Sequence, residues 1–161
     1  MSEIALRLAR LGDAPRIANL SRTLIETGLP WSWTPRRVAA HMRLREHLTV
    51  IAVNGGELAG FVLAQFGSRS VHLALLGVAH AHQRNGLGRQ LVGWVEESAS
   101  IAGLFLMQLE VRAGNHQALR FYASMGYRET SRTVGYYSGL EDAIRLERDL
   151  AVASKRLRQS M

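Results

Sequence analysis

The sequence predicts a mixed α+β fold, with helices on both faces of a sheet, from three observations. Apolar stretches rich in β-branched residues recur along the chain and indicate strands. Two segments place a capping residue just before a proline, which is typical of helix starts. A glycine-broken loop follows one strand and leads into an amphipathic helix. With 161 residues and no internal repeat, the chain suits one domain over 1–152, followed by a basic tail at 153–161.

The N-terminal half is expected to contain four strands and two helices. Asp13 offers a side-chain cap for the first helix, and Thr34-Pro35 gives the same signal for the second. Asn54-Gly55-Gly56 is a strong hairpin turn between two apolar strands. The expected strands are Ile4–Leu8, Leu48–Val53, Glu57–Phe66 and Val71–Val78.

The C-terminal half continues with two helices and three strands. Apolar residues at near four-residue spacing mark a helix from Leu87 to Ala102. The almost unbroken apolar run Leu104–Val111 is typical of a central strand covered on both faces. Asn115 can cap the next helix. The last two strands, Tyr127–Val134 and Ala143–Leu150, are expected to pair antiparallel across the connection 135–140.

The loop between Leu76 and Arg89 carries the clearest functional signal. Its glycines and the helix that follows would present backbone N–H groups and a partial positive charge to an anion. The dinucleotide fingerprint needs a third glycine where Leu91 stands, and the nucleoside-triphosphate loop needs Gly-Lys-Ser/Thr where Arg89 follows Gly88. A phosphate site of another kind remains, with a ligand-free glycine turn as the alternative.

The pattern Gln83-x-x-Gly86-x-Gly88 resembles the pyrophosphate loop of the GCN5-related N-acetyltransferase (GNAT) superfamily, which holds acetyl-coenzyme A. Residues 109–127, Leu-Glu-Val-Arg-Ala-Gly-Asn-His-Gln-Ala-Leu-Arg-Phe-Tyr-Ala-Ser-Met-Gly-Tyr, resemble the segment that follows this loop in the same superfamily. Together the two motifs and the element order extend the resemblance from about Ile4 to Leu150. It implies the GNAT fold, with a central, mostly antiparallel twisted sheet of about seven strands and a splayed central strand pair.

The resemblance implies that acetyl-coenzyme A is the co-substrate. Gly77 inside an apolar strand marks a bulge or the close approach of a ligand to the backbone. A splay there would free backbone groups of Leu76 and Val78 for the pantetheine arm, and the Val78 N–H is a candidate oxyanion donor or an ordinary ladder donor. The expected cofactor-binding residues are Leu76, Gly77, Val78, Gln83, Arg84, Asn85, Gly86, Leu87, Gly88, Arg89, Asn115 and Tyr122.

Two residues are the candidates for catalysis. Glu110, at the end of its strand, can take the proton of the acceptor amine, directly or through water. Tyr122, two helical turns after Asn115, can protonate the departing sulfur. The structural alternatives are a carboxylate paired with Arg112 or Arg120 and a core tyrosine with a satisfied hydroxyl group.

The acceptor is less well defined by the sequence. Residues 135–143, Gly-Tyr-Tyr-Ser-Gly-Leu-Glu-Asp-Ala, resemble the ending of the ribosomal-protein alanine N-acetyltransferases, which strengthens Glu110 as base and Tyr122 as acid. Ala79-His80 departs from the acidic residue and proline common in such enzymes, so the acceptor stays open among a small-molecule amine, a protein N-terminus and lysine. Candidate substrate-binding residues are Trp31, Trp33, Tyr136 and Tyr137; for the tryptophans, a cover over the core is an equal alternative.

Composition sets the remaining expectations. The net charge of +7, almost entirely from arginine, suits an anionic ligand, and nucleic acid is not the expected partner. The absence of cysteine excludes an acyl-cysteine intermediate, so acyl transfer must be direct or use another nucleophile. Direct transfer of the acetyl group to a primary amine is expected. No metal site, membrane span or signal peptide is expected, and the location is expected to be cytoplasmic. A non-catalytic acyl-coenzyme A-binding module is the alternative function, and a homodimer is compatible with the sequence.

Overall fold

A computed structural model describes residues 3–152, so the basic tail expected at 153–161 lies outside the described residues. The order of strands and helices agrees with the sequence prediction, with two short 3-10 helices in addition. The elements are β1 (Ile4–Leu8), η1 (Leu11–Asp13), α1 (Ala14–Leu24), α2 (Pro35–Arg43), β2 (His47–Asn54), β3 (Glu57–Phe66), β4 (Val71–Val78), η2 (His80–His82), α3 (Leu87–Ile101), β5 (Leu106–Arg112), α4 (His116–Ser124), β6 (Arg128–Tyr137) and β7 (Glu141–Asp149).

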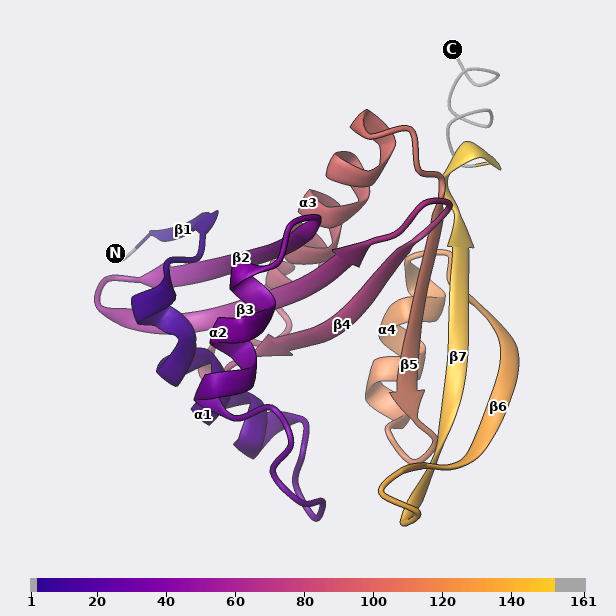
Figure 1. The fold of residues 1–161 in the computed structure, drawn as a ribbon, viewed down its shortest axis with the longest axis horizontal. Helices are drawn as coiled ribbons and strands as arrows, with labels where there is room; N and C mark the ends of the chain where they lie inside the picture. The colour runs from indigo at the N-terminus through magenta and orange to yellow at the C-terminus, as the bar shows by residue number, and fades with distance from the viewer. Residues whose placement is uncertain (1–2, 153–161) are drawn as a thin grey trace. The chain divides into compact units, whose positions relative to one another are not determined.

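The strands of the described residues form a seven-stranded sheet in the order β1-β2-β3-β4-β5-β7-β6. The β1–β2, β2–β3, β5–β7 and β6–β7 pairs are antiparallel, whereas β4 and β5 pair in parallel. The chain divides into two compact units. The first comprises the chain up to Phe66 together with Leu73–Val95, and the second comprises Gly67–His72 together with the chain from Glu96 on. Figure 1 shows α4 next to β5 in the second unit, with β7 and then β6 beyond β5.

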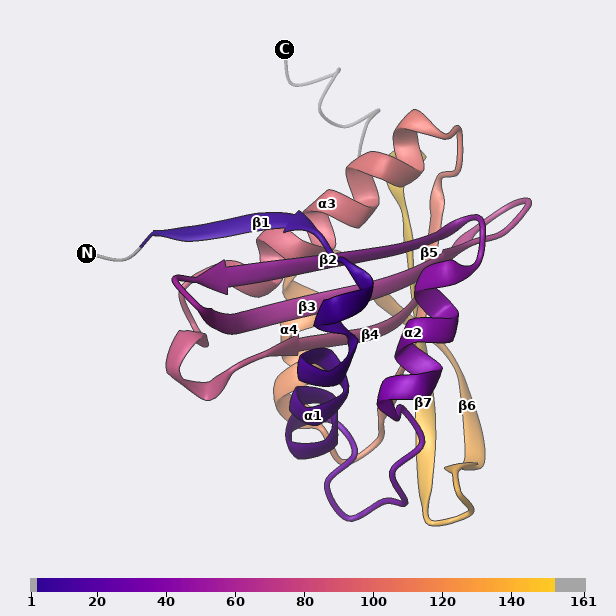
Figure 2. The same cartoon turned by 60° about the vertical axis from the view of Figure 1, so that its left-hand side comes forward.

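In the first unit, helices cover both faces of the sheet. Phe61 and Leu63 of β3 are fully buried in a cluster with residues of α1 and α2. The neighbouring Gly60 faces the opposite way, because a Cβ atom there would lie 3.1 Å from Leu91 of α3. Figure 2 accordingly shows α1 and α2 on one side of β2 and β3 and α3 on the other. The main cluster comprises Ala14, Ile17, Ala18, Val38, Ile51, Phe61, Leu63 and Leu75.

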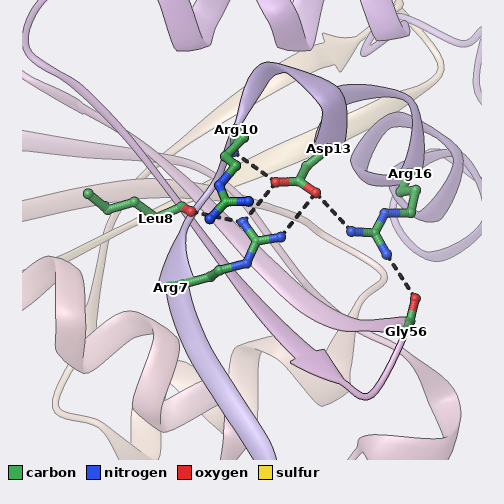
Figure 3. Close-up of polar contacts among 6 residues, drawn as sticks. All are labelled: Arg7, Leu8, Arg10, Asp13, Arg16 and Gly56. Atoms are coloured by element: carbon green, nitrogen blue, oxygen red, sulfur yellow. Dashed lines mark hydrogen bonds and ion pairs between the residues drawn. The ribbon is translucent and has the colours of Figure 1, made fainter.

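Asp13 ties the start of α1 to β1 instead of capping the helix. Its carboxylate accepts hydrogen bonds from the Arg10 backbone N–H at 2.8 Å, from Arg7 at 3.0 and 3.3 Å and from Arg16 at 2.8 Å (Figure 3). Arg16 also donates to the carbonyl of Gly56 in the β2–β3 turn. Burial opposes ionisation of Asp13, yet these hydrogen bonds hold its pKa well below the usual range. The side-chain cap predicted for Asp13 is therefore wrong, because this network takes both carboxylate oxygens.

In the second unit, the burial of β5 and the length of the β6–β7 connection differ from the sequence prediction. Residues on one face of β5, Met107, Leu109 and Val111, are buried, but the other face is only half-buried and polar. The prediction that both faces of this strand are covered is therefore wrong. The final hairpin also has a shorter connection than expected, since β6 continues to Tyr137 and β7 begins at Glu141. Tyr136 and Tyr137 consequently lie in a strand and not in a loop. No helix within residues 3–152 is long and apolar enough to span a membrane.

His41 is a buried histidine in α2 of the first unit. Its ring packs edge-on against His47 at 4.5 Å and against Trp33 at 6.0 Å, measured between ring centroids. The Nε2 atom is buried and has no hydrogen-bond partner within the described residues. Burial, with the charges of His47 and Arg37, outweighs the hydrogen bond that the ring donates to the backbone of Leu48 and lowers the pKa of His41 from 6.5 to about 4. The folded protein therefore holds this ring neutral in mild acid.

The pKa of His41 predicts a loss of stability in mild acid. The unfolded chain takes up a proton at this ring below pH 6.5 and the folded chain does so only near pH 4, so the contribution is complete above 6.5 and falls as the pH drops between these values. The loss is at most about 3 kcal/mol. Urea unfolding of the wild type from pH 7.5 to 4 should show this decrease, and His41→Gln should have a flatter profile.

The exposed His80 provides a matched control, because His80→Gln removes a histidine without removing a buried one. Its unfolding free energy should retain the wild-type dependence on pH. Equal slopes for the wild type and His41→Gln between pH 6.5 and 4 would contradict the proposed protonation on unfolding.

Candidate active site

The glycine-rich loop joins β4 to α3 in the first unit. Ala79 donates its backbone N–H to the carbonyl of Ala59 at 2.9 Å, and the side chain of Gln83 donates to the carbonyl of Val78 at 2.9 Å. Gln83 thus closes the loop onto the end of its own strand. Arg84 and Gly86 both have positive φ angles, 66° and 79°. The sequence predicted the backbone freedom of Gly86 but not the left-handed conformation of Arg84.

The start of α3 suits a phosphate group. Leu87, the first residue of the helix, is buried and anchors it. Gln90 donates its N–H to the carbonyl of Gly86 at 3.1 Å, so the amides of Leu87 and Gly88 precede this helical hydrogen bond. A Cβ atom at Gly86 would meet nothing within 4 Å, which leaves space beside the loop. The residues therefore fit the pyrophosphate of a coenzyme A molecule.

Gly77 has a packing reason to be glycine. A Cβ atom there would lie 2.6 and 2.7 Å from two ring carbons of Phe61, far inside van der Waals contact. The ring of Phe61 is fully buried, so it has little room to move. The sequence assigned Gly77 to a bulge or to ligand approach; the contact with Phe61 explains the residue without either, and the approach of a ligand stays a prediction.

The ladder between β4 and β5 is short. Within residues 3–152 it comprises two pairs, Val71 with Met107 and His72 with Gln108, and both lie in the second unit. It ends before Leu76 and Val78, the residues expected to pair with pantetheine. The carbonyl of Val78 already accepts from Gln83, whereas the role of the Val78 N–H stays a prediction.

The Trp31 and Trp33 loop between α1 and α2 is held by a buried carboxylate. Glu26 accepts hydrogen bonds from the backbone N–H of Ser32 at 2.8 Å, from the Ser32 hydroxyl group and from the Trp33 N–H. Both indole rings are partly buried and pack against the apolar cluster. Arginine side chains cover them, Arg22 over Trp31 at 4.7 Å and Arg37 over Trp33 at 3.9 Å. The structure therefore supports a covering role, and substrate contact stays a prediction.

Glu110 lies on the polar face of β5 in the second unit. Its Oε2 atom is 2.5 Å from His72 Nε2, and its Oε1 atom is 3.7 Å from the guanidinium group of Arg145. Arg145 stands directly opposite Glu110 in the β5–β7 ladder. Burial alone would raise the pKa of Glu110, but the hydrogen bond and charge of His72 and the charge of Arg145 lower it below its usual value. Neither Arg112 nor Arg120, the partners considered from sequence, holds this carboxylate; Arg112 pairs with Glu141.

Tyr122 is buried in α4 of the same unit, with its ring edge-on to Phe121 and Tyr127. Burial raises its pKa, and so does the neighbouring Tyr137. Tyr122 therefore stays protonated at neutral pH, and its role as a proton donor stays a prediction. The pKa of Tyr137 is raised by burial, by Tyr136 and by the charge of Glu110. The structure thus gathers Glu110, Tyr122 and Tyr137 within one unit.

Asn115 has the structural role predicted for it. Its Oδ1 atom accepts from the backbone N–H of Ala118 at 3.1 Å and caps α4. Contact of Asn115 with a cofactor stays a prediction. Tyr136, half-exposed in β6, packs edge-on against Tyr137. Two residues of the site were missed by sequence reasoning, His72 and Arg145. His72 is marked only by its polarity within the apolar strand β4, and Arg145 is one of several charged residues in β7. Pairing between strands brings both to Glu110.

The predicted residues fall into two sets, which are described separately. The first unit holds Trp31, Trp33 and the loop residues from Leu76 to Arg89, and the second holds Glu110, Asn115, Tyr122, Tyr136 and Tyr137. In the described residues, no cluster of three or more histidine, aspartate or glutamate side chains could hold a metal ion. The first unit offers a loop with a glycine and an arginine in the left-handed region, and the second offers an ionised carboxylate and a protonated tyrosine. Binding of an anion by the loop and proton transfer by the two side chains stay predictions.

Comparison with known proteins identifies the class. The family model described as "Acetyltransferase (GNAT) domain" matches residues 28–141. The chain therefore belongs to the GNAT acetyltransferase family, and it is an N-acetyltransferase that uses acetyl-coenzyme A. The fold and activity inferred from the two sequence motifs are confirmed. The enzymatic assignment also removes the reason to prefer a non-catalytic binding module.

One relative in sequence and two solved structures illustrate what this chain is similar to. The ribosomal protein bS18 alanine N-acetyltransferase of Escherichia coli (strain K12) is 31% identical over 118 residues, which cover 71% of this chain and 78% of that protein. The crystal structure of the ribosomal-protein-S18-alanine N-acetyltransferase from Escherichia coli matches with a TM-score of 0.79 and 26% identity, covering 92% of this chain and 94% of that one. Ard1 from Thermoplasma volcanium matches with a TM-score of 0.81 and 21% identity, over 91% and 97% of the two chains, and shows the fold alone.

The contact between Gly77 and Phe61 predicts that Gly77→Ala destabilises the protein. The new methyl group must displace a buried ring, which typically costs about 1–3 kcal/mol. Gly93→Ala is the matched control, because a Cβ atom at Gly93 in α3 meets nothing within 4 Å. That variant should gain about 0.5–1 kcal/mol from helix propensity. Urea unfolding measures both; equal effects of the two substitutions would argue against the packing explanation.

Proposed function

We propose that this enzyme acetylates the α-amino group of a protein N-terminus. The observation that carries the proposal is the 31% identity, over 71% of this chain, with a ribosomal protein alanine N-acetyltransferase. The chemistry of the site favours the same acceptor. An α-amino group has a pKa of about 8 and lysine one of about 10.4, so at neutral pH far more of the α-amine is already uncharged. A carboxylate with a lowered pKa, such as Glu110, suits the acceptor that is easier to deprotonate.

The loop of the first unit is proposed to bind acetyl-coenzyme A. The pyrophosphate would be held by the backbone amides around Gly86 and Gly88 and by the start of α3. Arg84 and Arg89 add positive charge to the same segment. The bound thioester supplies the acetyl group. Asn115 and Tyr122 are kept as proposed contacts of the cofactor, as are Leu76, Gly77 and Val78.

Glu110 and Tyr122 are proposed to handle the protons of the reaction. The acceptor ammonium group loses one proton before it can attack, and Glu110 provides the negative charge that draws this proton away. The attacking nitrogen loses its second proton as the amide forms. Tyr122 gives its hydroxyl proton to the departing sulfur and recovers one from the nitrogen, so the tyrosine is unchanged at the end of the cycle. Tyr137, beside both residues, is proposed to contact the acceptor.

Two peptides test the acceptor. One begins with a free alanine and contains no lysine, and the other has a blocked N-terminus and a single lysine. The free α-amine should be acetylated about 10-fold faster or more at pH 7.5, because a larger fraction of it is uncharged. Thiol release gives the rate, and mass spectrometry gives the modified position. Preferential acetylation of the lysine peptide would overturn the proposed acceptor while leaving the family assignment intact.

Tyr122→Phe tests the proton donor. Loss of the hydroxyl group should lower kcat about 100-fold, the lower range for a general acid. The KM for acetyl-coenzyme A should change little, because the ring and its packing remain. Tyr127→Phe is the matched control: this phenol donates to Glu96 at 2.9 Å, so its loss should lower stability and not kcat. A kcat for Tyr122→Phe equal to that of Tyr127→Phe would exclude the proposed role.

A further inference from the structure

His72 makes a short contact with Glu110, and the roles proposed above for Glu110 and Tyr122 make no use of it. His72 is the second residue of β4 and pairs with Gln108 in the parallel ladder. Glu110 lies two residues further along β5 and therefore on the same face of the sheet. The ladder brings His72 Nε2 to 2.5 Å from Glu110 Oε2, a short contact between two ionisable groups.

The two side chains differ in their access to solvent. The side chain of Glu110 is 15% exposed, and that of His72 is 36% exposed. The contact uses only Nε2 of the imidazole. Within the described residues, no hydrogen bond is made by Nδ1, the other ring nitrogen. A neutral imidazole that donates from Nε2 carries a lone pair on Nδ1. His72 thus offers a proton-accepting atom on the more accessible side of the pair.

We propose that His72 and Glu110 act as one unit, in which His72 Nδ1 receives the proton of the acceptor ammonium group and Glu110 orients the imidazole ring. This inference rests on the proposed function and specifies where its first proton goes. The proton leaves the ammonium nitrogen and reaches Nδ1 through a water molecule. The N–H bond breaks and the nitrogen keeps its electron pair, while the Nε2–H bond to Glu110 persists. The products are a neutral amine and an imidazolium ion beside a carboxylate.

The surroundings of Glu110 favour this division of roles. The charged and titratable groups that face it are His72 from β4, Arg145 from β7 and Tyr137 from β6. Against the effect of burial, the hydrogen bond with His72 and the positive charge of Arg145 lower the pKa of Glu110, so the carboxylate remains ionised and holds a proton poorly. An imidazole group can take up a proton on its free nitrogen, and a carboxylate on the other nitrogen fixes the orientation of the ring.

The inference is tested by the pH dependence of kcat and kcat/KM for His72→Gln and Glu110→Gln, with whichever amine the wild type acetylates faster. In His72→Gln, the side-chain amide can still donate to Glu110 but cannot take up a proton. Its kcat should fall about 100-fold, and the acidic limb of the wild-type pH profile should disappear. In Glu110→Gln the limb should persist, because the proton-accepting imidazole group remains.

Chemical rescue separates proton transfer from structural support. His72→Gly leaves a space beside Glu110, and added imidazole should restore at least about 10-fold of the lost rate. Substituted imidazoles should rescue according to their basicity, and His72→Gln, with its space filled, should not respond. Gln108→Ala is the matched control, because it removes the neighbouring polar residue of the same face, which bonds to Ser70 and Glu147. Its pH profile should equal that of the wild type.

A wild-type pH profile and a kcat within a few-fold of the wild type in His72→Gln would overturn the inference and leave Glu110 as the sole proton acceptor. Rescue that does not depend on the basicity of the added imidazole would also overturn it. A wrong assignment of the acceptor can be told apart from a wrong assignment of His72. The acceptor is tested by which peptide the wild type acetylates, whereas the role of His72 is tested by the variants.

Discussion

The register of β4 against β5 is the constraint on which the candidate catalytic residues depend. Two residue pairs set it, Val71 with Met107 and His72 with Gln108. Side chains alternate between the faces of a strand, so a slip of one residue would turn His72 to the opposite face from Glu110. The ladder comprises only two residue pairs within the described residues, but it decides whether an imidazole or an apolar side chain lies beside the half-buried carboxylate of Glu110.

The side chains of β5 alternate between the two faces of the sheet in the second unit. One face packs Met107, Leu109 and Val111 into the core, and the other carries Gln108, Glu110 and Arg112, each with a charged or polar partner. On the other side of the unit, Glu96 of α3 joins Arg148 of β7 and Tyr127 through hydrogen bonds of 2.8 to 2.9 Å. Glu110 differs from these other carboxylates of the second unit in its short contact with a histidine.

Features that depend on neighbouring residues in the chain could be predicted from the sequence. Predictions were wrong where residues from distant segments contact one another. The caps Thr34 and Asn115 and the turn at Asn54 depend on neighbours in the chain, and the structure confirms them. Asp13 has the sequence of a cap, but Arg7 and Arg16 compete for its oxygens. The family was recognisable from two motifs because each is a continuous segment.

Residues that depend on pairing between strands could not be placed in advance. In the sequence, nothing distinguishes His72 from any other polar residue at the start of a strand. The parallel pairing of β4 with β5 places it beside Glu110. The sequence assigns Gly77 to a bulge or to the approach of a ligand, whereas the ring of Phe61 from a neighbouring strand, which leaves no space for a Cβ atom, cannot be inferred along the chain. In both cases the physical cause is a contact between residues far apart in sequence.

Glu26 gives the loop of Trp31 and Trp33 a property that matters for altering the enzyme. Its buried carboxylate holds the backbone of Ser32 and Trp33, so the course of the loop is determined largely by a residue outside it. The indole side chains take no part in those hydrogen bonds. The tryptophans could therefore be exchanged in a combinatorial library while the main chain keeps its path, provided that Glu26 is retained.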